Sequence, residues 1–115
     1  MHEVIFYQNS RGDHPVKDFL DNLDKKSRAK AYQYLILLEK EGPGLLRPYA
    51  DHVRGKIREL RVSFSSVNVR IFYFFFLKDK IVLLHAFSKK TQELPEREID
   101  QAERNMKDWI QKEDL

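Results

Sequence analysis

The sequence predicts an α+β fold in which a mainly antiparallel sheet carries helices packed against it, in the order β-α-α-β-β-β-α. Two observations support this fold class. Apolar residues recur at helical spacing in three separate segments, and three strand-like apolar segments follow one another between residues 56 and 88. The length of 115 residues fits one domain of ordinary size, so residues 1–115 are expected to form a single domain.

The first elements are a short strand and a helix. The segment EVIFY at residues 3–7 is typical of a strand, and DHPVKDFLDNL at residues 13–23 predicts a helix. Pro15 takes the first helical position, with Asp13 or His14 as the cap. One face of this helix is traced by apolar residues at positions i, i+3, i+4 and i+7, namely Val16, Phe19, Leu20 and Leu23.

A second helix is expected directly after the first. Asp24 is a good N-cap for the segment KKSRAKAYQYLILLEKE, and Gly42 and Pro43 stop the helix. Its repeat is traced by Tyr32, Leu35, Ile36 and Glu39.

Three strands and a final helix complete the predicted chain. The strands cover about Lys56–Phe64, Val67–Leu77 and Lys80–Ser88, and the segment KDK at 78–80 is short enough for a hairpin turn. The last helix starts at Pro95, with two glutamates in its first turn, where the helix dipole favours anions. One face of it carries Ile99, Ala102, Met106, Trp109 and Ile110.

Composition excludes several classes of protein. Hydrophobic residues make up 42% and charged residues 34%, which predicts a folded soluble domain. The sequence has no cysteine, so disulfides and thiolate metal sites are excluded, as suits a reducing cytoplasm. The N-terminus does not have the pattern of a signal peptide, and the longest apolar run, VRIFYFFFL, is too short to span a membrane. We therefore expect a cytoplasmic protein without a membrane partner.

Charge is unevenly distributed along the chain. Between Arg47 and Thr91 there are ten Lys and Arg residues against three acids, a net charge of +7, whereas the rest of the chain carries −4. A basic central segment between more acidic flanking segments indicates a polyanionic partner. A merely solvated basic surface is the equally weighted alternative.

Polar side chains on the predicted strands form a candidate site. Strand alternation puts Leu60, Val62 and Phe64 on the core face, so Glu59 and Arg61 are expected on the open side. Arg70 lies in the next strand, and Lys89 and Lys90 end the third. One carboxylate among several cations suits phosphoryl chemistry, because a carboxylate accepts a proton and cations hold a phosphate as its charge grows.

Plainer interpretations of the same residues stay open. Glu59 can form only a cross-strand ion pair with Arg61 or Arg70, and the two lysines can be solvated. His85 lies among apolar neighbours, which is more typical of a satisfied core or supporting group than of a general acid. The four histidines have no ligand spacing, so no metal site and no cofactor are expected.

Three segments resemble a known family. They are GKIRELR, VRIFY and KIVLLHAFSKKTQELPEREIDQAERNMKDW, and they are similar to the HigB-like, phage-derived branch of the RelE/ParE toxin superfamily. That branch has an aromatic-Glu-Leu-Arg strand, an Arg-Ile-x-Tyr strand and a Leu-Leu-His-Gly-Phe-x-Lys-Lys-Thr-Gln-x-x-Pro ending. Arg58 stands where the family has Trp or Tyr, and Ala86 replaces the usual Gly. The resemblance implies a RelE-like fold.

The resemblance also implies a function and a set of site residues. It implies the toxin of a type II toxin–antitoxin pair, a ribosome-dependent mRNA endonuclease that works without metal through attack by the RNA 2′-hydroxyl. The implied partners are mRNA on the ribosome and a cognate antitoxin, often a helix-turn-helix protein of the HigA type. The implied catalytic residues are Glu59, Arg61, Arg70 and Lys90. The implied RNA-binding residues are Lys56, Arg58, His85, Lys89 and Thr91.

Two other functions remain possible on the same scaffold. One is a ParE-like toxin that inhibits DNA gyrase without nuclease activity. The other is a non-catalytic RNA- or ribosome-binding module, for which the basic middle of the chain would suffice. The retention of Glu59 together with the surrounding cations favours the nuclease.

Overall fold

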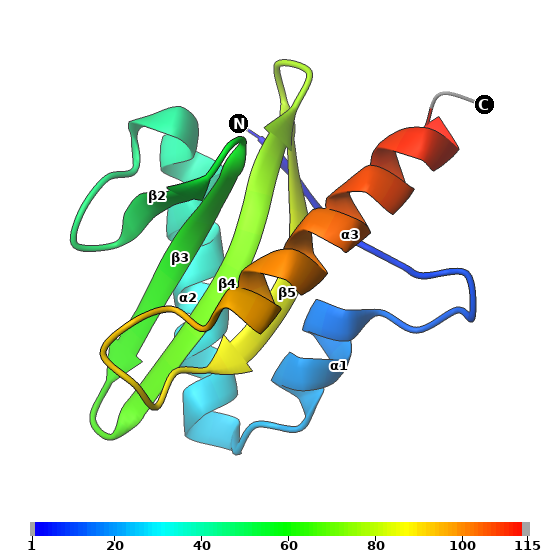
Figure 1. Cartoon of the computed structure of the whole chain (residues 1–115). Coiled ribbons are helices and arrows are strands. Elements are labelled where there is room, and N and C mark those ends of the chain that lie inside the picture. Colours follow the sequence, from blue (N-terminus) through cyan, green and yellow to red (C-terminus); the bar gives the residue numbers. More distant parts are fainter. Residues whose placement is uncertain (1, 114–115) are drawn as a thin grey trace.

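The computed structural model describes residues 2–113 as a five-stranded mixed sheet with three α-helices (Figure 1). A short 3₁₀ turn, η1, follows the second helix. In chain order the elements are β1 (Glu3–Phe6), α1 (Pro15–Asp21), α2 (Lys25–Glu41), η1 (Gly42–Gly44), β2 (Ala50–Arg54), β3 (Ile57–Phe64), β4 (Val67–Phe76), β5 (Lys80–Ser88) and α3 (Glu96–Glu113).

The strands follow the order β1-β5-β4-β3-β2 across the sheet. The neighbours from β2 to β5 are antiparallel, as predicted, whereas β1 lies parallel to β5, with Glu3 beside Lys80. The sheet is therefore mixed rather than wholly antiparallel. The predicted element order was also incomplete, because it lacked β2.

Strand β2 was missed because its sequence, ADHVR, has only a weak apolar pattern. Ala50 is buried, but Val53 is only half-buried and the other three residues are polar or charged. β2 is an edge strand, so it needs pairing on one side only, and β3 supplies that pairing, with Ala50 opposite Leu60. A long-range partner, rather than local propensity, makes this segment a strand.

Helices cover the two faces of the sheet differently. α1 and α2 pack on one face, where Val16, Leu20 and Leu35 meet Leu60 and Val62 in one buried cluster. The predicted inner face of α1 is thereby confirmed. On α2, however, Ile36 is 62% exposed although it fits the predicted helical repeat. Its position brings it to the rim of the helix–sheet contact.

The other face of the sheet is covered by α3, which crosses it diagonally (Figure 1). Trp109 and Ile99 of α3 pack with Phe72 and Phe74 of β4 in a second buried cluster, together with Ile57 of β3. The chain between β5 and α3 forms a loop at residues 89–95 in front of β3 and β4 (Figure 1). This loop and α3 therefore border the part of the sheet that carries the candidate site residues.

Candidate functional site

An ion pair between two neighbouring strands lies at the centre of the candidate site. β3 and β4 pair with Arg61 opposite Arg70 and Glu59 opposite Phe72, which places Glu59 and Arg70 diagonally on the face beneath α3. The Nε atom of Arg70 is 3.0 Å from Oε1 of Glu59. Arg70 also donates a hydrogen bond from Nη1 to Oδ1 of Asn68, which holds the guanidinium from its other side.

This ion pair is buried, and the expectation that Glu59 points to an open side was wrong. The side chains of Arg70 and Glu59 are only 6% and 8% exposed. Strand alternation assigned the face correctly, but the same face carries Ile57 and Phe72 and is a second core beneath α3. Burial raises the pKa of Glu59, an effect that the positive charges of Arg70 and Arg61 oppose.

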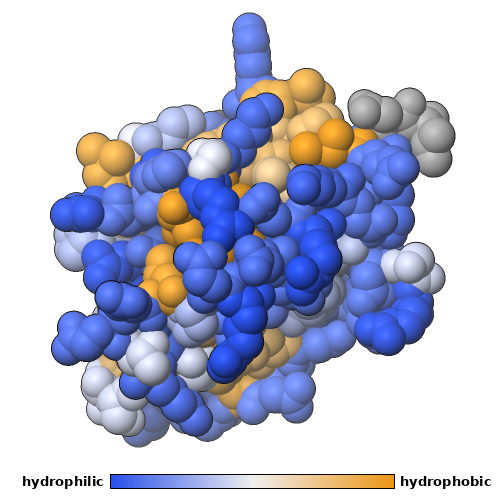
Figure 2. Space-filling model, in the orientation of Figure 1, coloured by the Kyte–Doolittle hydropathy of each residue, from blue (hydrophilic) through white to orange (hydrophobic). Residues whose placement is uncertain are grey.

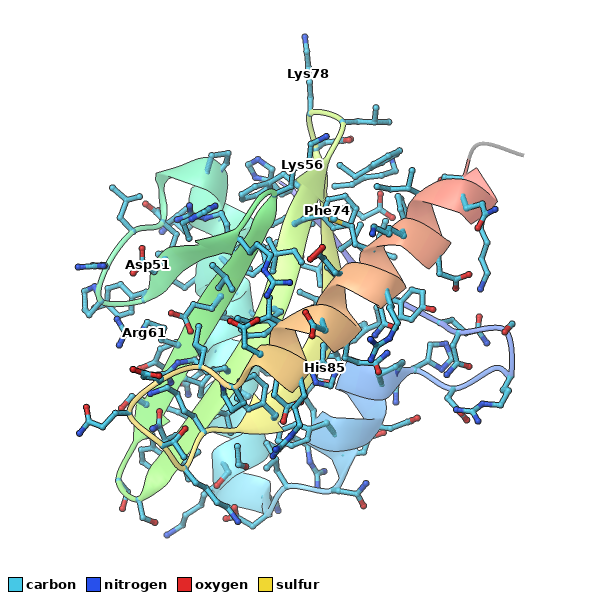
Figure 3. The ribbon with its side chains drawn as sticks, in the orientation of Figure 1. Asp51, Lys56, Arg61, Phe74, Lys78 and His85 are labelled. Atoms are coloured by element: carbon cyan, nitrogen blue, oxygen red, sulfur yellow. The ribbon has the colours of Figure 1, made fainter. Side chains whose placement is uncertain are left out.

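Arg61 is less buried than Arg70, its partner in the β3–β4 register. It is half-exposed on β3, and the carboxylate of Asp51 on β2 lies near it and Glu59; Figure 3 labels Arg61 and Asp51. The pKa of Asp51 is lowered by the backbone N–H of His52 and by Arg47, whose Nε is 2.8 Å from Oδ2. Asp51 escaped sequence analysis because its strand was not recognised.

The lysines that follow β5 have different surroundings. The backbone N–H of Lys89 donates to the carbonyl oxygen of Asn68 at 2.7 Å, and the Lys89 ammonium donates to the carbonyl oxygen of Gln92 at 2.8 Å. Thr91 uses its hydroxyl to bond the carbonyl oxygen of Glu93 at 2.7 Å. Lys90 is exposed. Lys89 and Thr91 therefore shape the loop, whereas the Lys90 ammonium faces solvent.

His85 has a carboxylate partner. The β4–β5 register shifts beside Phe72, which pairs with His85 while the next residue, Tyr73, pairs with Leu83. This bulge directs both Leu84 and His85 toward the α3 side. His85 Nε2 lies 2.6 Å from Oε1 of Glu98, in the first turn of α3, so the pair joins β5 to that helix.

Two of the expected RNA-binding residues lie apart from the ion pair. Arg58 alternates with Glu59 along β3, so its side chain lies on the opposite face, where it pairs in register with Tyr73. Lys56 lies in the turn between β2 and β3, and Figure 3 shows it at the opposite end of β3 from Arg61. The structure therefore does not bring Lys56 or Arg58 to Glu59.

Arg54 joins β2 to α3, a role that sequence analysis did not single out. Its guanidinium contacts three carboxylates of α3: Glu96 at 2.5 Å, Asp100 at 2.9 Å and Glu103 at 2.7 Å. The acids recur at about one-turn spacing along α3, but nothing local in the sequence indicates that Arg54 is their partner. At the other end of α3, Tyr7 donates a hydrogen bond to Asp108. These contacts join both ends of α3 to the rest of the protein.

The surface around this site is polar. Figure 2 shows the face with α3 as mostly hydrophilic, with apolar side chains in small areas between polar ones. A mainly apolar hollow of about 260 Å³ lies between β1 and α2, on the other face of the sheet, and contains none of the candidate catalytic residues. The described residues contain neither a metal-ligand cluster nor a membrane-spanning helix. Within residues 2–113, no three His, Asp or Glu side chains lie close enough together to bind a metal ion. No helix in the same range is long and apolar enough to cross a bilayer.

The fold and the site together define a small α+β protein in which a buried Glu59–Arg70 ion pair lies beneath α3, with the half-exposed Arg61 beside it. A family model described as phage-derived protein Gp49-like (DUF891) matches residues 18–107. The chain therefore belongs to the Gp49-like family, a RelE-like toxin family of toxin–antitoxin systems. No curated protein matches the chain.

Proposed function

We propose that this protein is a HigB-like toxin that cleaves mRNA on the ribosome and thereby inhibits translation. Membership of a toxin family supports the general class. The observation that carries the finer proposal is the buried Glu59–Arg70 pair with Arg61 beside it, because a gyrase inhibitor or a plain RNA-binding module needs no carboxylate held among guanidinium groups.

The proposed reaction uses a nucleophile that the RNA itself provides. The 2′-hydroxyl loses its proton and forms a bond from its oxygen to the adjacent phosphorus, while the bond from phosphorus to the 5′ oxygen breaks. The departing oxygen takes up a proton from solvent. The products are a 2′,3′-cyclic phosphate and a 5′-hydroxyl. Arginine and lysine side chains supply the positive charge that stabilises the phosphate as negative charge grows on it.

Each proposed catalytic residue has a role in this reaction. Glu59 accepts the proton, and the rise in its pKa caused by burial makes it a stronger base than a solvated carboxylate. Arg61, the half-exposed arginine, contacts the phosphate, and the buried Arg70, held in place by Glu59 and Asn68, adds positive charge behind it. Lys90, at the exposed start of the loop, adds a third cation. Lys89, Thr91 and His85 support the loop and the first turn of α3, within reach of the RNA backbone.

The ends of the RNA products test this proposal. Translating ribosomes incubated with the protein should yield mRNA fragments with 2′,3′-cyclic phosphate and 5′-hydroxyl ends. Cleavage should persist in EDTA once the magnesium that ribosomes need is restored. Fragments with 3′-hydroxyl and 5′-phosphate ends would rule out attack by the 2′-hydroxyl. Intact mRNA together with stalled gyrase would instead identify a ParE-like inhibitor.

A toxin of this family implies an antitoxin partner. We propose that this partner is a HigA-like helix-turn-helix protein encoded beside the toxin gene. Expression of the toxin alone should arrest growth, and co-expression of the adjacent gene should restore it. Normal growth during strong expression of folded toxin would contradict the toxin function itself.

A further inference from the structure

The loop between β5 and α3 surrounds a hollow that the proposed cleavage chemistry does not use. The segment Thr91–Arg97 lines an open space of about 550 Å³. The hollow is open to solvent, and its lining residues all come from this one segment. The loop begins at Lys89, which is bonded to Asn68 on β4, so the hollow lies next to the strand that carries Arg70.

Contacts at both ends hold this loop in shape. At its start, Lys89 is bonded to Asn68 through backbone and side-chain groups, and its ammonium bonds the carbonyl oxygen of Gln92. At its end, Glu96 is bound by Arg54, and Glu98, one turn into α3, contacts His85. A hollow held by contacts in this way needs little ordering when a ligand enters, which lowers the cost of binding.

The lining of the hollow suits a flat, uncharged ligand. Leu94 and Pro95 are half-buried, and Leu94 packs against the cluster beneath α3, which gives the hollow a fixed apolar side. Glu93 is exposed and forms no ion pair with any residue between 2 and 113. Arg97, in the first turn of α3, also lines the hollow; its side chain is exposed, with its Nε atom 3.8 Å from Oε2 of Glu98.

The charged side chains near the loop favour different positions for the phosphate and the base of a nucleotide. Arg61 and Lys90 attract a phosphate, whereas the hollow carries opposite charges, on Glu93 and Arg97, and therefore does not favour an anion. A nucleobase carries no charge, packs against apolar side chains, and can donate hydrogen bonds to a carboxylate when it has an amino group. The phosphate and the base of one RNA strand thus suit different residues in this part of the protein.

We infer that this hollow binds an unpaired nucleobase next to the scissile phosphate and that Glu93 selects bases with an exocyclic amino group, which are adenine, cytosine and guanine. This inference rests on the proposed nuclease function. The amino group donates to Glu93 while the ring lies against Leu94 and Pro95. Uracil is disfavoured, because its carbonyl oxygens flank its single ring N–H and repel the carboxylate.

Cleavage mapping on ribosome-bound mRNA tests the inference. Wild-type protein should disfavour uracil at one position beside the cut, and Glu93→Gln should reduce that discrimination by about tenfold, because the Gln amide also donates to uracil. The exposed Glu41, at the end of α2, supplies the matched control Glu41→Gln, which should keep the wild-type base profile. A Glu93→Gln protein that cuts with the wild-type base profile would overturn the inference.

A binding measurement separates this inference from the nuclease proposal. The probes are 2′-O-methyl trinucleotides, which cannot be cleaved because the attacking hydroxyl is blocked. NMR signals of Leu94 and its neighbours should shift with trinucleotides that contain adenine, cytosine or guanine, and shift less with uracil alone. If wild-type protein cuts no mRNA but shows these shifts, the nuclease proposal fails and the base site stands. If the loop signals do not move, the base site is wrong whether or not the protein is a nuclease.

Discussion

Arg70 and Glu59 form an ion pair across two strands, with Nε 3.0 Å from Oε1, and both side chains are more than nine-tenths covered. Covering two charges has a high cost in desolvation, which their mutual attraction offsets only when both are present. The pair also lies beside Arg61, so it joins the core of the fold to the proposed site. Its contributions to stability and to cleavage can be separated by experiment.

The first prediction concerns stability. Glu59→Ala and Arg70→Ala should each lower the free energy of unfolding by about 3–5 kcal/mol, because each leaves one buried charge without its partner. The double variant should lose less than the sum of the two, since neither charge then remains. Urea unfolding of the four proteins completes the cycle. Additive losses would show that the two residues do not stabilise each other.

The second prediction concerns pH. Because burial raises the pKa of Glu59 above its ordinary value of 4.5, the folded protein keeps the proton to higher pH than the unfolded chain does. The free energy of unfolding should therefore fall as the pH rises from about 4.5 through the folded pKa. Glu59→Gln lacks this titration, so its stability should fall less over the same window. A wild-type protein that gains stability relative to Glu59→Gln in this window would contradict the raised pKa.

Most elements of the fold could be predicted because their apolar periodicity is local. β5 was predicted with the bounds Lys80–Ser88 that it has, and the start of α2 after Asp24 is confirmed. The parallel pairing of β1 with β5 could not be predicted, because it joins residues far apart in the chain and leaves no local signal. β2 was missed for the same reason, since its pairing with β3 makes it a strand.

The sequence indicated which residues lie in the candidate site, but it did not indicate that α3 buries them. The sequence pattern singled out Glu59, Arg61 and Arg70, and alternation put Glu59 and Arg61 on one face; the β3–β4 register adds Arg70 to that face. Alternation cannot show what covers that face. The cover is α3, which packs on the sheet through Ile99 and Trp109 and is contacted by Arg54 through carboxylates 42 to 49 residues away. Long-range contacts of this kind decide whether a strand residue is open or buried.

The third prediction concerns Arg54 and the position of α3. Arg54→Ala removes contacts to three carboxylates and leaves Glu96, Asp100 and Glu103 to repel one another. We expect a lower melting temperature and faster amide hydrogen exchange in the first half of α3. The contacts are partly exposed, so about 1 M salt should screen them and shrink the difference from wild type.

Lys107→Ala is the control for Arg54→Ala, because Lys107 is an exposed cation on α3 itself. It should melt like wild type at low and high salt. If Arg54→Ala also exchanged its α3 amides at the wild-type rate, apolar packing by Ile99 and Trp109 alone would fix the helix.

The last prediction concerns cleavage and depends on the contrast between two exposed lysines. Lys90 starts the loop beside the proposed site, whereas Lys78 lies at the tip of the β4–β5 hairpin, far from Arg61 (Figure 3). Lys90→Ala should slow ribosome-dependent cleavage by about 100- to 1,000-fold, because it removes a cation that stabilises the phosphate in the transition state. Lys78→Ala should cut and arrest growth like wild type. Both variants should melt normally, since neither side chain is buried. A Lys90→Ala protein that cuts as fast as the Lys78→Ala protein would show that the exposed end of this loop takes no part in holding the phosphate.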